Sequence, residues 1–251
     1  MSIAIVTGAS SGMGREFVRQ ISKRYKTISE IWVIARRIDK LEELSQEIDN
    51  VNIRPLKFDI SNEADLIRFK LMLIQENPQV RILVNSAGYG IIGSFEEVCS
   101  DNVDMCKVNC VGLTKMIEFV LPYMNCNKGN IFNLASAAAF MPQPFFATYA
   151  ATKSYVLSLS RALNSELKDK NITVTAVCPG PVKTEFFDVA EKYKSVKFYK
   201  KLTMVKAEEV VKLALSDGFH GKSVSVYGFT MNCFRILSKV LPHGFMMKFI
   251  K

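Results

Sequence analysis

Short apolar runs rich in β-branched residues alternate along this chain with longer segments in which apolar positions recur every three or four residues. This alternation is typical of βαβ units, in which crossover helices join parallel strands. It predicts strands over Ile3–Val6, Ile31–Ala35, Ile53–Phe58, Arg81–Val84, Asn130–Leu134, Thr173–Cys178 and Ser223–Tyr227. It predicts helices over Arg15–Tyr25, Asp39–Ile48, Ala64–Gln75, 103–124, 149–169 and 206–217. We therefore expect an α/β fold with a doubly wound parallel sheet of about seven strands and helices on both faces.

The chain shows no sign of a second folded domain. Its 251 residues suit one α/β domain, and no repeat or Pro/Gly/Ser-rich linker interrupts the alternation. We predict a catalytic domain over residues 1–228 and a separate tail over residues 229–251. The tail is apolar and basic and contains no acidic residue. We expect it to pack on the domain or on a partner subunit, and peripheral contact with an anionic membrane surface is the alternative.

The bulk composition narrows the class of protein without identifying it. Hydrophobic residues make up 49% of the chain and charged residues 23%, which is typical of a folded globular domain. No DNA- or RNA-binding motif accompanies the net charge of +9, so nucleic acid is not an expected partner. No secretory signal and no uniformly apolar segment of membrane-spanning length is found, and we expect a cytoplasmic protein.

The cysteines and histidines do not form a metal-binding pattern. The six cysteines include no C-x-x-C pair, and the only histidines are His220 and His243. We predict no metal site and expect free, mostly buried thiols.

A glycine-rich turn directly follows the first predicted strand and opens the first predicted helix. It spans Thr7 to Gly14 and reads TGASSGMG. Gly8 permits a tight turn, Gly12 lets the backbone approach a phosphate, and Gly14 allows close packing of the helix. The helix N-terminus adds free N–H groups and a favourable dipole for an anion. The turn predicts a Rossmann-type site for the pyrophosphate of a dinucleotide.

The same turn has two other interpretations. Residues 8–12 match the Gly-x-Ser-x-Gly nucleophile elbow of α/β-hydrolases, with Ser10 as the nucleophile. However, an elbow so near the N-terminus leaves no preceding strand for the oxyanion-hole loop, and a triad would have to recruit His220 or His243. A serine hydrolase is therefore kept as an alternative function, beside a purely structural glycine turn.

The end of the second predicted strand bears on the choice of dinucleotide. An NAD-binding unit normally carries Asp or Glu here to hold the ribose hydroxyls, whereas this chain has Ala35 followed by Arg36 and Arg37. Two guanidinium groups suit a 2′-phosphate. The sequence therefore favours NADP(H) over NAD(H) as the cofactor.

A tyrosine and a lysine four residues apart are the candidate catalytic pair. Tyr149 and Lys153 lie in a predicted helix, so both side chains fall on one face. We expect the ammonium group to lower the pKa of the phenol from about 10 toward the working pH, as a general acid or base requires. Alone, such a pair is usually a chance occurrence on a helix surface. Ser136 supports a functional role, because it follows a predicted strand at the edge where doubly wound sheets bind ligands.

Together these motifs resemble the short-chain dehydrogenase/reductase family. The Thr-Gly-x-x-x-Gly-x-Gly spacing is similar to that of the family, and so is the serine thirteen residues before the tyrosine. Residues 85–88 read Asn-Ser-Ala-Gly, with Ser86 in place of the second Asn of the family's Asn-Asn-Ala-Gly loop. The resemblance extends from Thr7 to Thr184. It implies a catalytic tetrad of Asn109, Ser136, Tyr149 and Lys153.

The resemblance also implies how the residues would act. The cofactor contacts would be Gly8, Ser10, Ser11, Gly12, Met13, Gly14, Arg36, Arg37, Asp59, Ile60, Asn85, Ala87, Gly88, Tyr149, Lys153, Pro179, Gly180, Val182 and Thr184. Tyr149 would exchange a proton with the substrate oxygen that Ser136 orients, while NADP(H) exchanges a hydride with the carbon. Asn109 would help to hold a water and Lys153 in a proton relay. The implied reaction interconverts a carbonyl and a secondary alcohol.

Apolar residues around the candidate site bear on the substrate. They are either core or pocket lining: Tyr89, Ile91, Ile92, Phe140, Met141, Pro142, Phe145 and Phe146. As pocket lining they would suit a bulky apolar molecule such as a steroid, a bile acid or a lipid-derived ketone. Five lysines fall where the family usually has a mobile substrate lid: Lys192, Lys194, Lys197, Lys200 and Lys201. They either form a solvated helix face or attract an anionic substrate.

The family resemblance implies a homodimer or a homotetramer. An NADP-binding regulatory or membrane-associated protein remains the other alternative to an enzyme.

Overall fold

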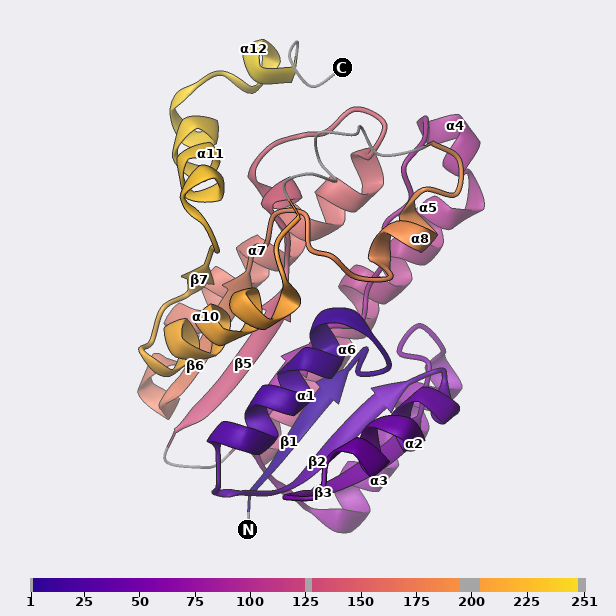
Figure 1. Ribbon diagram of the computed structural model, residues 1–251, viewed down its shortest axis with the longest axis vertical. Coiled ribbons are helices and arrows are strands. Elements are labelled where there is room, and N and C mark those ends of the chain that lie inside the picture. Colours follow the sequence, from indigo (N-terminus) through magenta and orange to yellow (C-terminus); the bar gives the residue numbers. More distant parts are fainter. Residues whose placement is uncertain (1, 125–127, 195–203, 248–251) are drawn as a thin grey trace.

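Seven parallel strands form one twisted sheet at the centre of the molecule. The structure is a computed structural model that describes residues 2–124, 128–194 and 204–247. The strand order is β3-β2-β1-β4-β5-β6-β7 (Figure 1). The strands are β1 Ser2–Thr7, β2 Ile28–Ala35, β3 Asn52–Lys57, β4 Gln79–Asn85, β5 Gly129–Leu134, β6 Ile172–Val177 and β7 Val224–Ser225. The predicted doubly wound sheet is confirmed.

Helices cover both faces of the sheet (Figure 1). One face carries α1 Gly12–Arg24, α2 Ile38–Glu47 and α10 Ala207–Phe219. The other carries α3 Glu63–Glu76, α6 Leu113–Val120 and α7 Ala147–Glu166. Each face has its own apolar core, with Phe17 and Leu41 on the first and Phe69 and Met116 on the second. Because both faces are covered, all six residues of β5 are buried, as expected of a central parallel strand.

The helix predicted over residues 103–124 is divided into four segments. These are α5 Ser100–Cys106, a π-helical segment Lys107–Gly112, α6, and a 3₁₀ turn Leu121–Tyr123. Tertiary contacts account for the π segment: the Asn109 side chain bonds to a neighbouring loop, and Gly112 lies against the main-chain oxygen of Ile60. Sequence periodicity could not reveal this, because the partners lie on other elements.

Several short helices escaped prediction. They are α4 Phe95–Val98, α8 Phe186–Ala190 and the 3₁₀ turns Ala137–Phe140 and Lys168–Lys170. The first turn of α4 is stabilised by a capping box, in which the Ser94 hydroxyl and the Glu97 carboxylate each accept the other's main-chain N–H.

The tail forms two further helices, α11 Phe229–Val240 and α12 His243–Met247. Both extend beyond the carboxyl-terminal edge of the sheet (Figure 1). Within the described residues, no helix combines the length and the apolar character needed to cross a membrane. In the same part of the chain, no cluster of three or more His, Cys, Asp or Glu side chains could hold a metal ion.

The expectation of mostly buried thiols is wrong for the cysteines that are described. All five are free, but only Cys178 is buried, while Cys99 and Cys106 are exposed. The α5 region turns the latter two toward solvent, whereas Cys178 follows β6 inside the core. Cys126 lies outside the described residues.

Candidate active site

The predicted site residues come together at the carboxyl edge of the sheet, where the strand order reverses between β1 and β4. This switch point is where doubly wound sheets bind their ligands. β1 ends in Thr7, whose hydroxyl oxygen accepts the N–H groups of Ser86 and Ala87 at 3.2 Å each. Gly8 has a φ of +67°, and a Cβ atom there would lie 2.6 Å from the Ala87 nitrogen. Gly8 is therefore required both for its conformation and for space.

The N-terminus of α1 is open toward this edge. Ser11, the N-cap residue, makes no side-chain capping bond, and the first turn has no acidic residue. Gly12 has a φ of +54° and packs against Thr184 of the loop after β6. The main-chain N–H groups and the helix dipole at this end of α1 therefore suit a pyrophosphate. We call the region between the glycine turn and that loop the groove.

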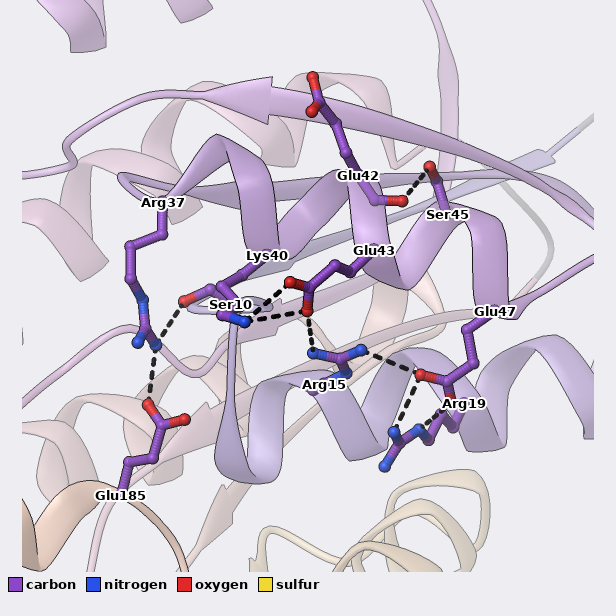
Figure 2. A network of polar contacts seen from close by, with 10 residues as sticks. All are labelled: Ser10, Arg15, Arg19, Arg37, Lys40, Glu42, Glu43, Ser45, Glu47 and Glu185. Atoms are coloured by element: carbon purple, nitrogen blue, oxygen red, sulfur yellow. Dashed lines mark hydrogen bonds and ion pairs between the residues drawn. The ribbon is translucent and has the colours of Figure 1, made fainter.

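Arg36 and Arg37 follow the last residue of β2 and point in different directions. Arg36 is 76% exposed, and its guanidinium lies 3.8 Å from the Asp59 carboxylate. Arg37 reaches back across the turn (Figure 2): its Nη2 donates to the Ser10 hydroxyl at 3.2 Å and to the Glu185 carboxylate at 2.9 Å. Ser10 and Arg37 thus provide a hydroxyl and a cation side by side. This pair fits the 2′-phosphate of NADP(H).

The remaining predicted cofactor residues lie along the same edge. Asp59 accepts both the N–H and the hydroxyl of Ser61, and the adjacent Ile60 is buried. Asn85 is buried and donates to Asn133 on β5 at 2.9 Å, which ties β4 to its neighbour rather than to the groove. Gly88, beyond it, is exposed.

The loop after β6 closes the other side of the groove. The main-chain oxygen of Pro179 accepts the N–H of Ala137 at 2.8 Å, which ties this loop to the segment carrying Ser136. Val182 is buried and pairs with Val205, and Gly180 is covered by Met231 of α11. Met13, in the first turn of α1, packs on the core beneath the groove.

Ser136 and Tyr149 meet beside this groove. Ser136 is the N-cap of the 3₁₀ turn after β5, and its oxygen accepts the N–H of Ala138 at 3.1 Å. Tyr149 is in the first turn of α7, with its ring stacked on Phe146 at a centroid distance of 4.3 Å. Burial raises the pKa of Tyr149 to about 12, although a hydrogen bond with Ser136 acts in the opposite direction.

The expectation that the Tyr149 pKa falls below its usual value is therefore wrong for this structure. Lys153 lies one turn further along α7, with its Nζ 5.5 Å from the centre of the Tyr149 ring. Burial lowers the pKa of Lys153 to about 8, and the same loss of water disfavours the phenolate. Tyr149 consequently carries its proton at neutral pH.

Lys153 and Asn109 are fixed by main-chain partners. Lys153 Nζ donates to the Leu134 oxygen at 2.6 Å. Asn109 Nδ2 donates to the Tyr89 oxygen at 2.8 Å and to the Thr152 hydroxyl at 3.1 Å, while Asn109 Oδ1 accepts the Tyr89 N–H at 3.1 Å. Asn109 sits in the π-helical segment, and such segments often mark functional sites. The structure thus brings all four predicted catalytic residues to one edge.

The apolar residues named from the sequence divide between core and site. Phe146 and Tyr89 pack around Tyr149, whereas Ile91 and Met141 are buried core residues. Phe145 is exposed with a φ of +62°, and Phe140 contacts Phe234 of α11.

Two of the expected lid lysines have partners in the described structure. Lys192 pairs with Asp101 at 2.9 Å, and Lys194 lies 3.8 Å from the centre of the Phe145 ring. Lys197, Lys200 and Lys201 fall outside the described residues.

Sequence reasoning missed three residues at the site. Gly90 lies against the Tyr149 ring, since a Cβ atom there would be 2.5 Å from Tyr149 Cδ2. Phe186 of α8 lies on the same ring at a centroid distance of 5.5 Å. Glu185 bonds Arg37 across the groove. Adjacent motif residues could have drawn attention to these positions, but only the fold shows what they touch.

The contacts around Ser10 do not favour the hydrolase alternative. Its hydroxyl is bonded to Arg37, a permanent cation that cannot act as a general base. The ring nitrogens of His220 and His243 face the main-chain oxygens of Ser216 and Ser238. Neither histidine is paired with Ser10 as a catalytic dyad requires.

Comparison with known proteins agrees with this geometry. A sequence profile described as short chain dehydrogenase matches residues 2–194. The chain belongs to this family of oxidoreductases.

Individual relatives resemble this chain over most of its length. It is 31% identical over 222 residues to the NADP-dependent 3-hydroxy acid dehydrogenase of Schizosaccharomyces pombe, covering 84% of each chain. It is 34% identical over 184 residues to the very-long-chain 3-oxoacyl-CoA reductase of Emericella nidulans, covering 70% of this chain and 52% of that one. A short-chain dehydrogenase from Sphingobium yanoikuyae, solved with NADPH, superposes with a TM-score of 0.83 at 26% identity, covering 98% and 95% of the two chains.

Proposed function

We propose that this protein is an NADPH-dependent reductase of the 3-oxo group of a fatty acid or acyl derivative, and that it can run in reverse on the 3-hydroxy compound. The observation that carries the proposal is the buried Tyr149 with Lys153 one turn away on α7 and Ser136 after β5, together at the carboxyl edge of the sheet. The substrate class is supported by the two relatives, whose names specify a 3-hydroxy acid and a 3-oxoacyl-CoA.

The proposed roles follow from the protonation states. A carbonyl that becomes an alcohol needs a proton on its oxygen, and Tyr149 holds one at neutral pH because burial keeps its pKa high. Ser136, which is close enough to act on the pKa of Tyr149, orients the same oxygen and stabilises its developing charge. Lys153, whose Nζ lies 5.5 Å from the centre of the ring, stabilises the phenolate that remains. Asn109 fixes the Tyr89 loop that borders the ring.

The residues at this edge fit NADPH, which would supply the hydride when it is bound. The N-terminus of α1 and Gly12 would hold its pyrophosphate, and Ser10 with Arg36 and Arg37 would hold its 2′-phosphate. The fit rests on the absence of a carboxylate at Ala35, because a carboxylate there would repel that phosphate.

The aromatic surroundings of Tyr149 favour an apolar chain next to the reacting carbonyl. Phe146 and Phe186 lie on the Tyr149 ring, while Phe140 contacts Phe234 of α11. The aromatic surface formed by Phe146 and Phe186 suits an acyl chain. It also suits a steroid or a bile acid, which remain predictions from the sequence.

The test is oxidation of NADPH by the purified protein, followed by absorbance with NADH in parallel. A 3-oxoacyl thioester, a 3-oxo acid, a ketosteroid and an oxo-bile acid would be the substrates. We expect turnover with NADPH on the first two. Turnover on only the steroid or the bile acid would refute the substrate class. Binding of NADPH without any turnover would favour the regulatory alternative instead.

The cellular setting remains a proposal. A cytoplasmic location is consistent with the free thiols of the described cysteines. The homodimer or tetramer expected from the family resemblance stays a prediction, which sedimentation analysis would check.

A further inference from the structure

One face of α11 is an apolar stripe that no described part of the chain covers. Phe229, Ile236 and Val240 are 83%, 63% and 74% exposed. With Cys233 they follow a spacing of four, three and four residues, which places all four side chains on one side of the helix. Leu237 and, after the helix, Phe245 extend the exposed apolar surface. An exposed apolar patch of this kind marks a binding surface for another protein or for a membrane.

The opposite face of α11 anchors the helix to the active-site region. Met231 covers Gly180, and the Phe234 ring lies 6.1 Å from that of Phe140. The Asn232 side chain donates to the main-chain oxygens of Val226 and Gly228 and thereby holds the start of the helix. The helix is therefore held in place beyond the edge of the sheet at which the site lies (Figure 1), and its apolar stripe is exposed.

The charges around the stripe identify its partner. No acidic residue occurs between Gly218 and Met247. Lys239 is exposed on α11, whereas Arg235 is half-buried and acts on the buried Cys178 thiol. A second copy docking through the same stripe would bring these cations together without an acidic residue of α11 or α12 to pair with them. An anionic lipid surface accepts both the apolar side chains and the cations.

We propose that α11 docks this protein on an anionic membrane surface, with Phe229, Ile236, Leu237 and Val240 inserted among the lipids. Docking would bring Phe140, which contacts Phe234 of α11, close to the bilayer. The proposal concerns lipid binding and holds whatever the substrate is.

The test is co-sedimentation of the full chain with vesicles of pure phosphatidylcholine or of phosphatidylcholine with phosphatidylglycerol. We expect binding to the anionic vesicles, weakened by salt, and little binding to the neutral ones. Val240→Asp should lower the partition coefficient by more than about tenfold, since burial of a valine is lost and a negative charge is added. The matched control is Leu71→Asp on α3, which alters an equally apolar residue that is 58% exposed. It should bind as wild type does.

A second pair of variants tests the electrostatic part. Lys239→Gln should weaken binding to anionic vesicles about fivefold, whereas Lys26→Gln, before β2 at the other end of the sheet, should not. Retained NADPH binding shows that each variant is folded. Equal binding of wild type and Val240→Asp overturns the proposal. The proposal is also overturned if wild type does not bind vesicles and the Val240→Asp variant no longer self-associates. The stripe would then be a subunit interface.

The network in Figure 2 carries a second inference, which is independent of the tail. Arg37 is the cation placed to hold the 2′-phosphate, yet its Nη2 already donates to Glu185 at 2.9 Å. Glu185 precedes α8, on the loop that closes the groove opposite the glycine turn. A phosphate arriving at Arg37 and Ser10 would lie next to this carboxylate and be repelled by it.

We infer that Glu185 competes with the 2′-phosphate for Arg37 and must release it when NADPH binds. The inference rests on the proposed role of Arg37. Calorimetry with adenosine 2′,5′-bisphosphate and with 5′-AMP tests both. In Glu185→Gln the bisphosphate should bind up to about fivefold more tightly, and 5′-AMP equally well, because an exposed ion pair contributes little. Asp188→Asn, on α8, is the matched control and should change neither affinity.

The outcomes are distinguishable. If wild type does not prefer the bisphosphate to 5′-AMP, the assigned 2′-phosphate site is wrong. If wild type prefers it but Glu185→Gln leaves the affinity unchanged or weaker, the site stands and the competition is refuted.

Discussion

Replacement of Gly90 by alanine would test whether the position of the Tyr149 ring controls the reaction. The added Cβ atom would lie 2.5 Å from Cδ2 of the ring and 2.9 Å from Cε2 of Phe146, which is stacked on it. Phe186 lies on the same ring and limits its retreat. The backbone of Gly90 is not left-handed, so alanine adds a steric change without backbone strain.

The size of the effect follows from the geometry. Ordinary contacts of a Cβ atom lie beyond 3.4 Å, so the ring must move by about 1 Å. A misplacement of that size costs on the order of 10²-fold in rate, or about 2.7 kcal/mol in the activation barrier. We therefore expect Gly90→Ala to lower kcat for NADPH oxidation about 100-fold while the Kd for NADPH changes little.

Gly244→Ala is the matched control, because a Cβ atom on that α12 residue meets nothing within 4 Å. It should leave kcat unchanged. A Gly90→Ala protein with normal kcat, normal Kd for NADPH and an unchanged melting temperature would refute the claim that the ring position controls the rate.

Three further predictions concern the phenol, the buried lysine and the glycine turn. Tyr149→Phe should lower kcat by about 10²- to 10⁴-fold and leave calorimetric NADPH binding intact; normal turnover would remove the phenol from the mechanism. Lys153 has a folded-state pKa of about 8, against 10.5 for the free side chain. Between pH 8 and pH 10.5 the unfolded chain therefore binds more protons than the folded protein, and the free energy of unfolding rises with pH. Urea unfolding should show a gain of about 2 kcal/mol from pH 8 to pH 10 in wild type relative to Lys153→Met, and equal slopes would contradict the burial argument. Gly8→Ala should lower the free energy of unfolding by more than about 2 kcal/mol, through backbone strain and the clash with Ala87. Gly221→Ala is the control, with a φ of +78° but open space around it, and should cost only about 1 kcal/mol. Equal urea midpoints of the two variants would refute the clash.

The order of the elements could be predicted from the sequence because each strand and helix carries its own periodicity. All seven predicted strands agree with the structure to within about three residues at each end, as expected of assignments from local patterns. Ser223–Tyr227 shortens to Val224–Ser225 because β7 pairs with β6 over only two positions. The continuous helix expected over 103–124 fails for a tertiary reason, since Asn109 and Gly112 respond to partners on other elements.

The chemistry divides in the same way. The glycine turn, the Arg36–Arg37 pair and the Tyr149–Lys153 pair could be predicted from the sequence, because residues close together in the chain form each of them. The pKa of Tyr149 was predicted in the wrong direction, since burial raises it and outweighs the opposing effect of Ser136.

The tail shows the same division between local pattern and tertiary structure. Its apolar and basic character is written in the sequence, but a helical stripe can face either a core or the solvent. Only the packing of Met231 and Phe234 decides that Phe229, Ile236 and Val240 face outward. The Arg37–Glu185 bond likewise joins residues 148 positions apart. Sequence by itself determined the elements and the local motifs, and tertiary structure alone decided which distant side chains share an environment, because solvation and contact depend on neighbours in space.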